Sequence, residues 1–499
     1  MSANPDTAAP TGRNKPAQGK ERSDAALGHA SQNTSSPEGA KQGGELHGSW
    51  QRVKLGQIAE VIMGQAPRGD ETNFEQRGAV FVKAGEFGPV RPVVREWTTR
   101  PLKFAKAGDV LICVVGATCG KLNLSIDCAI GRSVAALRPG ERTFDSFLHF
   151  QLMPKVLTLR AGSTGSAQGV LSRDVLAGIG LVLPPLPEQR RIVAEIEKQF
   201  TRLEAGVAAL RRVQANLKRY RAAVLKAACE GRLVPTEAAL ARSPRSTKNG
   251  PPAYETGAAL LARILTERRQ NWQGRGKHKE PSAPDTSKLP AVPDGWTWAT
   301  VEQLAAPEAN SITDGPFGSN LKTEHYMESG PRVLRLQNIG DGVYVDEESH
   351  ITQAHFERLQ KHRIFAGDVV IAGFGENPPR SCIIPESLGP AIVKADCIRF
   401  KPDSSVLPKY MNVALNSDPV RKRTKGMVHG VGRPRLNLGE IKSIVLPLPP
   451  LAEQTRIVAE VERRLSVVDE LESVVTANLQ RATRLRQSIL QCAFNGAFA

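Results

Sequence analysis

Several features are missing from this 499-residue sequence, and each absence removes a class of protein. No run of about 18 apolar residues occurs, so nothing is expected to span a membrane. The longest apolar stretch, Val110 to Ala117, has the length of a buried strand. The opening residues, MSANPDTAAP, lack the basic start and apolar core of a signal peptide. We therefore expect a cytoplasmic location.

Cysteine and histidine are sparse, and neither is spaced to hold a metal ion. The nine histidines form no cluster, and no two of the seven cysteines form a C-x-x-C pair. A disulfide framework or a zinc site is therefore not expected, and we interpret the cysteines as buried thiols. A phosphate loop of the form G-x-x-x-x-G-K-[ST] is also missing, so no ATPase activity is indicated.

The charge is unbalanced towards the basic side. The formal net charge is +17 and the isoelectric point is about 9.7. Residues 1–48 hold five basic and five acidic side chains and almost no large apolar ones. We therefore expect a disordered tail there and place the basic excess on the remainder. The excess indicates a polyanionic partner, nucleic acid first, although many proteins are basic without one.

A long internal repeat divides the chain into two halves. Leu183–Glu197 reads LPPLPEQRRIVAEIE and Leu448–Glu462 reads LPPLAEQTRIVAEVE, with twelve of fifteen positions identical. The offset of 265 residues continues without a gap as far as Gly231 and Gly496. The chain thus consists of two homologous halves.

Each repeat begins with prolines, which a first helical turn tolerates, and continues with helical periodicity. We expect long helices at 184–231 and 448–499, each stopping near a glycine. Apolar positions spaced about 3.5 residues apart predict that the helices form a coiled coil. We hypothesise an antiparallel pair, symmetric about residues 214 and 479, that places Arg221 opposite Glu472. The alternative is a seam that simply drifts.

A region of mixed character precedes each helix, at residues 49–183 and 295–447. Both regions contain short β-type runs bounded by Gly, Pro and Asp, and an Ala-Gly-Asp turn leads into a strand in both. We interpret them as homologous α/β domains whose loops have diverged. Residues 232–294 look like a linker with a docking helix at Gly257 to Trp272. The expected fold class is α+β, with two α/β domains separated by an antiparallel coiled coil.

The proline-rich entry to EQ-x-x-I-V-A-E-[IV]-E, used once in each half, resembles the specificity subunits of type I restriction–modification systems. So does the order of variable domain, long helix, variable domain, long helix, which covers the chain from Trp50 onward. Two smaller phrases resemble the family as well, Asp314–Ser319 and the run from Lys279 to Trp296.

The resemblance implies a non-catalytic DNA-binding subunit. Each variable domain would read one half of a split DNA site, and the helices would fix the gap between the half-sites. The expected partners are double-stranded DNA, two modification (methyltransferase) subunits and, where present, restriction subunits. No cofactor is expected on this chain, because S-adenosylmethionine and ATP would be bound by the partner subunits.

Candidate DNA contacts are basic or amide side chains in loops, because phosphates attract Lys and Arg and base edges suit Arg, Asn, Gln, Ser and Thr. The densest cluster, near residues 421–435, contains no acidic residue. A solvated charge run is the alternative there. The candidates are Gln65, Arg68, Lys83, Arg91, Arg95, Lys103, Ser163, Thr164, Ser319, Asn320, Lys322, Arg335, Asn338, Arg421, Lys422, Arg423, Lys425, Arg433 and Arg435.

The outward faces of the helix starts are candidates for binding the modification subunits. The residues concerned are Arg190, Arg191, Glu195, Arg456 and Glu460.

Two rival functions remain open at this stage. Asn377-Pro378-Pro379 resembles the core of an adenine-methylation motif, but that motif needs an aromatic residue next and Arg380 follows here. A coiled-coil scaffold that does not bind DNA would explain the helices but not two diverged domains with a basic excess. Affinity for DNA that falls steeply with salt would separate DNA reading from the scaffold.

Overall fold

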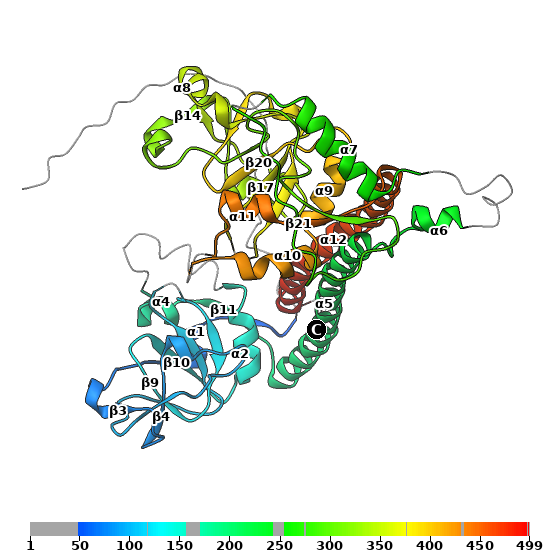
Figure 1. Ribbon diagram of the computed structural model, residues 1–499. Helices are drawn as coiled ribbons and strands as arrows, with labels where there is room; N and C mark the ends of the chain where they lie inside the picture. Colours follow the sequence, from blue (N-terminus) through cyan, green and yellow to red (C-terminus); the bar gives the residue numbers. More distant parts are fainter. Residues whose placement is uncertain are drawn as a thin grey trace, which may run out of the picture.

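The computed structural model describes residues 48–116, 118–155, 170–242, 254–273, 276–375, 377–430, 434–496 and 498. Two α/β domains are joined to opposite ends of a pair of long helices (Figure 1). The predicted N-terminal tail lies outside the described residues except for Gly48. In the described part of the chain, no helix is long and apolar enough to cross a membrane.

The first domain contains two sheets and a short ribbon. The ribbon pairs β1 with β11 and brings the two ends of the domain together at the start of the first long helix. One sheet has the order β2-β10-β7-β8 and the other β3-β5-β4-β9-β6. The bounds of the elements are β1 Gln51–Lys54, α1 Leu55–Ile58, β2 Ala59–Met63, η1 Gly69–Glu71, β3 Thr72–Asn73, β4 Ala79–Val82, η2 Ala84–Glu86, β5 Glu96–Thr98, β6 Phe104–Ala105, β7 Val110–Cys113, β8 Leu122–Leu124, β9 Cys128–Ile130, β10 Val134–Pro139, α2 Asp145–Leu152, α4 Arg173–Ala177 and β11 Gly180–Leu183.

The second domain repeats this plan. Its ribbon pairs β12 with β21, and its sheets have the orders β13-β20-β17-β18 and β15-β14-β19-β16. The bounds are β12 Thr297–Thr300, β13 Ile312–Thr313, η4 Gly318–Asn320, η5 Thr323–His325, β14 Tyr326–Leu334, η6 Leu336–Asn338, β15 His350–Ile351, α8 Gln353–Arg358, η7 Gln360–His362, β16 Arg363–Ile364, β17 Val369–Ala372, β18 Arg380–Ile383, η8 Glu386–Leu388, β19 Ala391–Val393, β20 Cys397–Phe400, α9 Pro408–Leu415, α10 Asp418–Thr424, η9 Lys425–Met427, α11 Leu438–Ser443 and β21 Val445–Leu448.

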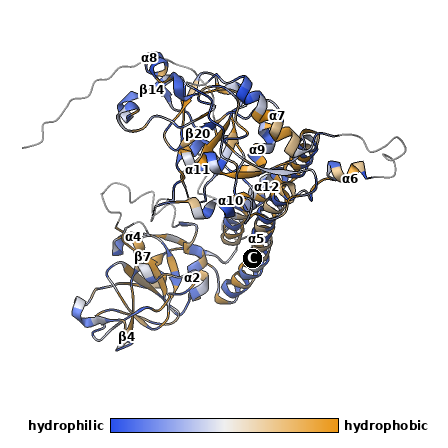
Figure 2. Ribbon diagram, viewed as in Figure 1, coloured by the Kyte–Doolittle hydropathy of each residue, from blue (hydrophilic) through white to orange (hydrophobic). Residues whose placement is uncertain are grey.

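The internal repeat extends to strand pairing. Each domain has one parallel pair in its second sheet, β4 with β9 and β14 with β19, and the remaining pairs among the described strands are antiparallel. The central strands β7 and β17 are fully buried, as expected for short apolar runs between glycine turns. Most strands of both domains are apolar in Figure 2, whereas the long helices alternate apolar and polar residues. The two domains therefore share one architecture.

The long helices α5 (Leu186–Cys229) and α12 (Leu451–Phe494) have 44 residues each. They run antiparallel, because Ile196 near the start of α5 packs in one cluster with Ile489 near the end of α12. Gly231 and Gly496 follow the helix ends with positive φ angles of 65° and 86°, which confirms the predicted stops. At about 1.5 Å per residue each helix is about 66 Å long.

The coiled coil has the predicted two-fold register. Arg221 lies 3.3 Å from Glu472, as hypothesised, and also forms an ion pair with Asp469. Arg486 forms the corresponding ion pair with Glu204, 3.2 Å apart. The pairs Arg221–Asp469 and Arg486–Glu204 are related by the same 265-residue offset, so the pseudo-two-fold axis is visible at single side chains.

Reversing the charge of Arg221 or Glu472 should destabilise the coiled coil slightly. We expect Arg221→Glu and Glu472→Arg each to lower the free energy of unfolding by about 0.5–1 kcal/mol, because both side chains are partly exposed. The double variant, with the charges exchanged, should regain part of this loss, although Asp469 still repels the new carboxylate at position 221. Urea denaturation of the three variants measures it, and additive losses in the double variant would contradict the register.

In the part of the linker that the structure describes, two helices dock rather than one. The predicted docking helix is α7 (Gly257–Gln270), whose Leu260 and Ile264 are fully buried against the second domain. The sequence did not predict α6 (Glu237–Ala241), which lies at the start of α12. There Glu453 accepts bonds from the Glu237 amide (3.1 Å) and the Trp296 indole (3.0 Å). The linker therefore fixes the second domain to α12.

Candidate nucleic-acid interface

The repeated Ala-Gly-Asp turn anchors the central strand of each domain through an ion pair to a buried aspartate. Asp109 is bound by Arg138 at 2.9 Å, and Asp368 by Arg399 at 2.6 Å. Both aspartates also accept a backbone amide three residues earlier, which closes the turn. Burial raises the pKa of the Asp368 carboxyl above its ordinary value. The neighbouring Arg399 opposes this effect and lowers that pKa, but the effect of burial is larger. These residues position β7 and β17 and are not free to bind a ligand.

The repeated glutamine joins each domain to its helix. Gln189 and Gln454 are fully buried. The side-chain oxygen of Gln189 accepts the Phe144 amide (2.8 Å) at the start of α2, and that of Gln454 accepts the Leu407 amide (3.0 Å) at the start of α9. Each domain is therefore held at a fixed angle to the coiled coil. The identical EQ dipeptides were the signal in the sequence, but their role was not predicted.

The C-terminal ends of β2, β7 and β9 lie beside the N-terminal end of β10. We call this edge, with its loops, the loop end of the first domain. The backbone N–H of Gln65 donates a hydrogen bond to the Ile130 carbonyl (3.0 Å), and that of Leu171 donates one to the Val114 carbonyl (2.9 Å). Gly64 is required here, because a Cβ would lie 2.3 Å from the Gly131 carbonyl oxygen. The loop end thus places several separate loops side by side.

The loop end of the second domain is built in the same way. The backbone N–H of Leu436 donates a hydrogen bond to the Gly373 carbonyl (2.7 Å). Gly315 is required, because a Cβ there would lie 2.1 Å from the Lys394 carbonyl carbon. Asp314 lies beside Asp396 and Arg435, and burial raises the pKa of its carboxyl to about 6. The glycine-containing loops after residues 64 and 315 therefore occupy equivalent positions in the two domains.

Most of the predicted contacts in the first domain gather at its loop end. Gln65 and Arg68 lie in the exposed loop after β2, and a Cβ on Gly131 would lie 3.1 Å from Cγ of Lys83. The backbone carbonyl of Lys103 accepts a hydrogen bond from the Ile130 amide. Arg95 comes directly before Glu96, which forms an ion pair with Lys83. Arg91 is separate. Its guanidinium donates to the Ser125 carbonyl (2.9 Å) near the start of β7, at the other end of that strand.

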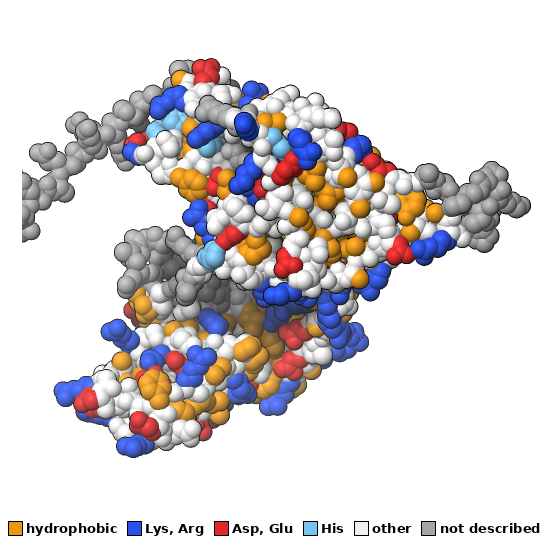
Figure 3. Space-filling model, in the orientation of Figure 1, with side chains coloured by type: hydrophobic (Ala, Val, Ile, Leu, Met, Phe, Trp, Pro, Cys, Tyr) orange, Lys and Arg blue, Asp and Glu red, His pale blue; other side chains and the backbone are white. Residues whose placement is uncertain are grey.

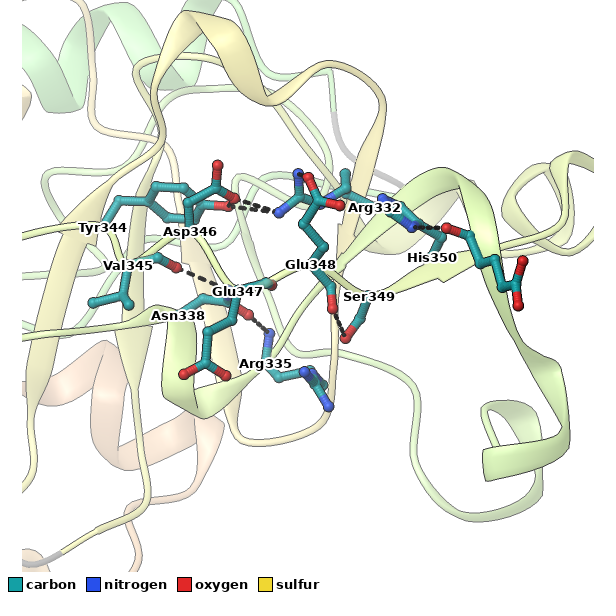
Figure 4. Close-up of polar contacts among 11 residues, drawn as sticks. Arg332, Arg335, Asn338, Tyr344, Val345, Asp346, Glu347, Glu348, Ser349 and His350 are labelled. Atoms are coloured by element: carbon teal, nitrogen blue, oxygen red, sulfur yellow. Dashed lines mark hydrogen bonds and ion pairs between the residues drawn. The ribbon is translucent and has the colours of Figure 1, made fainter. Parts of the chain in front are cut away.

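In the second domain, Ser319, Asn320 and Lys322 are exposed on and after η4. Arg335 follows β14 and is partly exposed. The structure does not favour Asn338 as a DNA contact. It is 1% exposed, and its amide donates to the carbonyls of Val345 (2.9 Å) and Glu347 (2.8 Å). Figure 4 shows it holding this loop in place, so its hydrogen-bonding groups are not available to a base.

The predicted cluster at 421–435 divides into structural and exposed residues. Arg421 donates to the Pro379 carbonyl (3.0 Å) and pairs with Asp341 (2.7 Å), and Arg423 is half-buried over the Trp298 ring. Arg423 also donates to the Val445 carbonyl (3.3 Å), so its guanidinium is engaged within the domain and the structure does not favour it as a DNA contact. Lys422 and Lys425 are exposed and, with Arg421, line a pocket of about 400 Å³.

The same pocket contains the segment that resembled a methylation motif, since Asn377 and Pro378 form part of its wall. Three predicted contacts, Ser163, Thr164 and Arg433, lie outside the described residues. A recess separates the two domains in Figure 3, and Lys and Arg side chains are scattered over both rather than gathered in one patch. Among the described residues, no group of His, Cys, Asp or Glu could hold a metal ion.

The helix starts present a mixed surface. Arg191 is exposed beside Glu188, Glu195 binds Lys198, and Arg190 lies over the Phe144 ring. Glu460 is bound by Arg463 and Arg464, which lower the pKa of its carboxyl to about 2. Arg456 differs in that its partner, Glu237, belongs to the linker helix α6 and not to its own helix. All five residues remain predicted partner contacts.

Comparison with known proteins decides the family. The family model described as "Type I restriction modification DNA specificity domain" matches residues 48–209 and 345–479. The chain belongs to the family of type I restriction–modification specificity subunits. The EcoBI specificity subunit of Escherichia coli is 23% identical over 464 residues, covering 90% of this chain and 86% of that one. The EcoDI subunit of the same species is 25% identical over 354 residues, covering 70% and 69%.

The fold agrees with this assignment. A chain solved in a structural study of complex assembly and conformational transition of the type I R-M system has a TM-score of 0.60 and 18% identity, covering 91% of this chain and 99% of that one. The protein is therefore a non-catalytic specificity subunit, whose domains recognise DNA sequence and which acts with other restriction–modification subunits.

Proposed function

We propose that this specificity subunit reads a split DNA site, one half with the loop end of each domain, and docks two modification subunits on its coiled coil. Restriction subunits join this core where they are present. S-adenosylmethionine and ATP are bound by these partners and not by this chain. The complex works in the cytoplasm, as expected from the sequence.

The observation that carries the proposal is the pseudo-two-fold coiled coil. Arg221–Asp469 and Arg486–Glu204 relate the two helices by a half-turn, and the buried glutamines fix each domain to its helix. A two-fold protein matches the two-fold symmetry of duplex DNA, and rigid spacing between two readers fixes half-site spacing. Helices of about 66 Å can separate the readers by more than one DNA turn of about 34 Å.

A change in gap length should therefore abolish tight binding. Two inserted base pairs move one half-site by about 7 Å and rotate it by about 70°, which the paired helices cannot follow. We expect the complex with its modification subunits to bind such a duplex at least tenfold more weakly than the duplex with the natural gap. Fluorescence anisotropy with duplexes differing only in gap length measures this. Equal affinities would show that the coiled coil does not set the spacing.

A further inference from the structure

One position of the fold carries very different side chains in the two domains. Arg435 pairs with Phe374 in an isolated β-bridge, and Val170 pairs with Val115 in the equivalent bridge. The two positions, 170 and 435, are related by the 265-residue offset of the helical repeat. Val170 is 57% exposed and the Arg435 side chain 46% exposed. The fold therefore presents this position to solvent at the loop end of both domains.

Arg435 is held by two neighbours from other loops. Its guanidinium lies over the Phe317 ring, 5.4 Å from the centroid. Its Nε lies 2.7 Å from Oδ1 of Asp396, which is fixed in the turn before β20 because its carbonyl accepts the Gly373 amide (2.9 Å). The stacking and the ion pair engage one face and one nitrogen of the guanidinium, and 46% of the side chain remains exposed to solvent.

The first domain lacks each of these three groups. Counting from the close-approach glycines, Ala66 stands where Phe317 stands. Ser133 stands where Asp396 stands, because its carbonyl accepts the Val114 amide just as the Asp396 carbonyl accepts that of Gly373. Val170 replaces Arg435. One scaffold with a changed set of exposed side chains is what two readers of different half-sites require.

We propose that Arg435 reads a guanine in the half-site of the second domain, with Asp396 as its positioning residue; this rests on the proposed function. The planar fork of an arginine donates two parallel hydrogen bonds to O6 and N7 of guanine in the major groove. Phe317 and Asp396 restrict the fork to one orientation. Val170 offers only apolar contact, so the first domain has another preference at its equivalent base pair.

The test compares adenine-methylation motifs in cells that carry the modification gene with the natural chain or a variant. Arg435→Lys keeps the charge and loses the fork, Arg435→Val installs the residue of the first domain, and Asp396→Asn removes the positioning charge. We expect preference for guanine at one base pair of one half-site to fall about 10- to 100-fold in Arg435→Lys and Arg435→Val. A smaller fall is expected at the same base pair in Asp396→Asn.

The control is Arg269→Lys on α7, an exposed arginine paired with Glu280, which should leave the motif unchanged. Arg435→Lys that keeps the full motif, or losses spread evenly over all sites, would overturn the inference in favour of a phosphate contact or none. If the natural chain directs methylation of a split motif, the proposed function stands whatever the variants show. If the natural chain directs no split motif, the proposed function itself fails.

Discussion

Affinity for duplex DNA will fall about 1000-fold when salt rises from about 50 to about 200 mM, if the exposed basic residues of both loop ends neutralise about six phosphates. Besides Arg435, which is proposed to read a base, the exposed basic candidates at the loop ends are Arg68, Arg95, Lys103, Lys322, Lys422 and Lys425. Each phosphate contact releases condensed counterions, so the logarithm of affinity falls linearly with the logarithm of salt. Anisotropy of the assembled complex on a labelled duplex gives the slope.

Lys422 and Lys425 provide a sharper form of this test. Replacing both by glutamine removes two charges from one pocket without touching the buried core. The magnitude of the salt slope should fall by about two, and affinity should fall to a similar extent for all sequences. An unchanged slope would mean that this pocket faces away from DNA. A weak slope for the natural chain would favour a scaffold that does not bind DNA.

Arg399→Met should destabilise the second domain by about 3–5 kcal/mol, because it leaves Asp368 buried without its partner. The side chains of Arg399 and Asp368 are only 5% and 4% exposed, so water cannot compensate for the loss. The double variant Arg399→Met with Asp368→Asn should be less destabilised than the single variant, since no charge is left buried. Asn can still accept the Phe365 amide that closes the turn.

Urea denaturation followed by circular dichroism measures these losses. The matched control in the chain is Arg138→Met in the first domain, where Arg138 is 31% exposed and also lies 3.8 Å from Glu60. Partial exposure should make that loss smaller. A loss below about 1 kcal/mol in Arg399→Met would show that the buried pair contributes nothing to the stability of the domain.

The architecture could be predicted from the sequence because it repeats. Two copies of one motif located both helices and both glycine stops, and the spacing of apolar residues gave the register that pairs Arg221 with Glu472. The Ala-Gly-Asp turns marked equivalent strands in both domains. Periodicity and an offset are properties of the chain itself, so they can be read without knowing which elements pack together.

The roles of single side chains could not be predicted in the same way. Asn338 and Arg423 have the chemistry of DNA contacts, but tertiary packing directs one into a loop and the other over Trp298. The loop that contains Asp346 and Glu347 comes close to Asn338 only through folding (Figure 4). Arg435 was one candidate among many in the sequence. Its distinction from Lys422 appears only when Phe317 and Asp396 are placed beside it.

The central claim is that this chain directs a separate modification subunit to a split DNA site. Single-molecule sequencing of adenine methylation, in cells that carry this gene with and without its modification partner, tests it most directly. We predict a gapped, two-part motif that is methylated only when both proteins are present. Methylation by this chain alone, or no motif from a complex that assembles normally, would contradict the account.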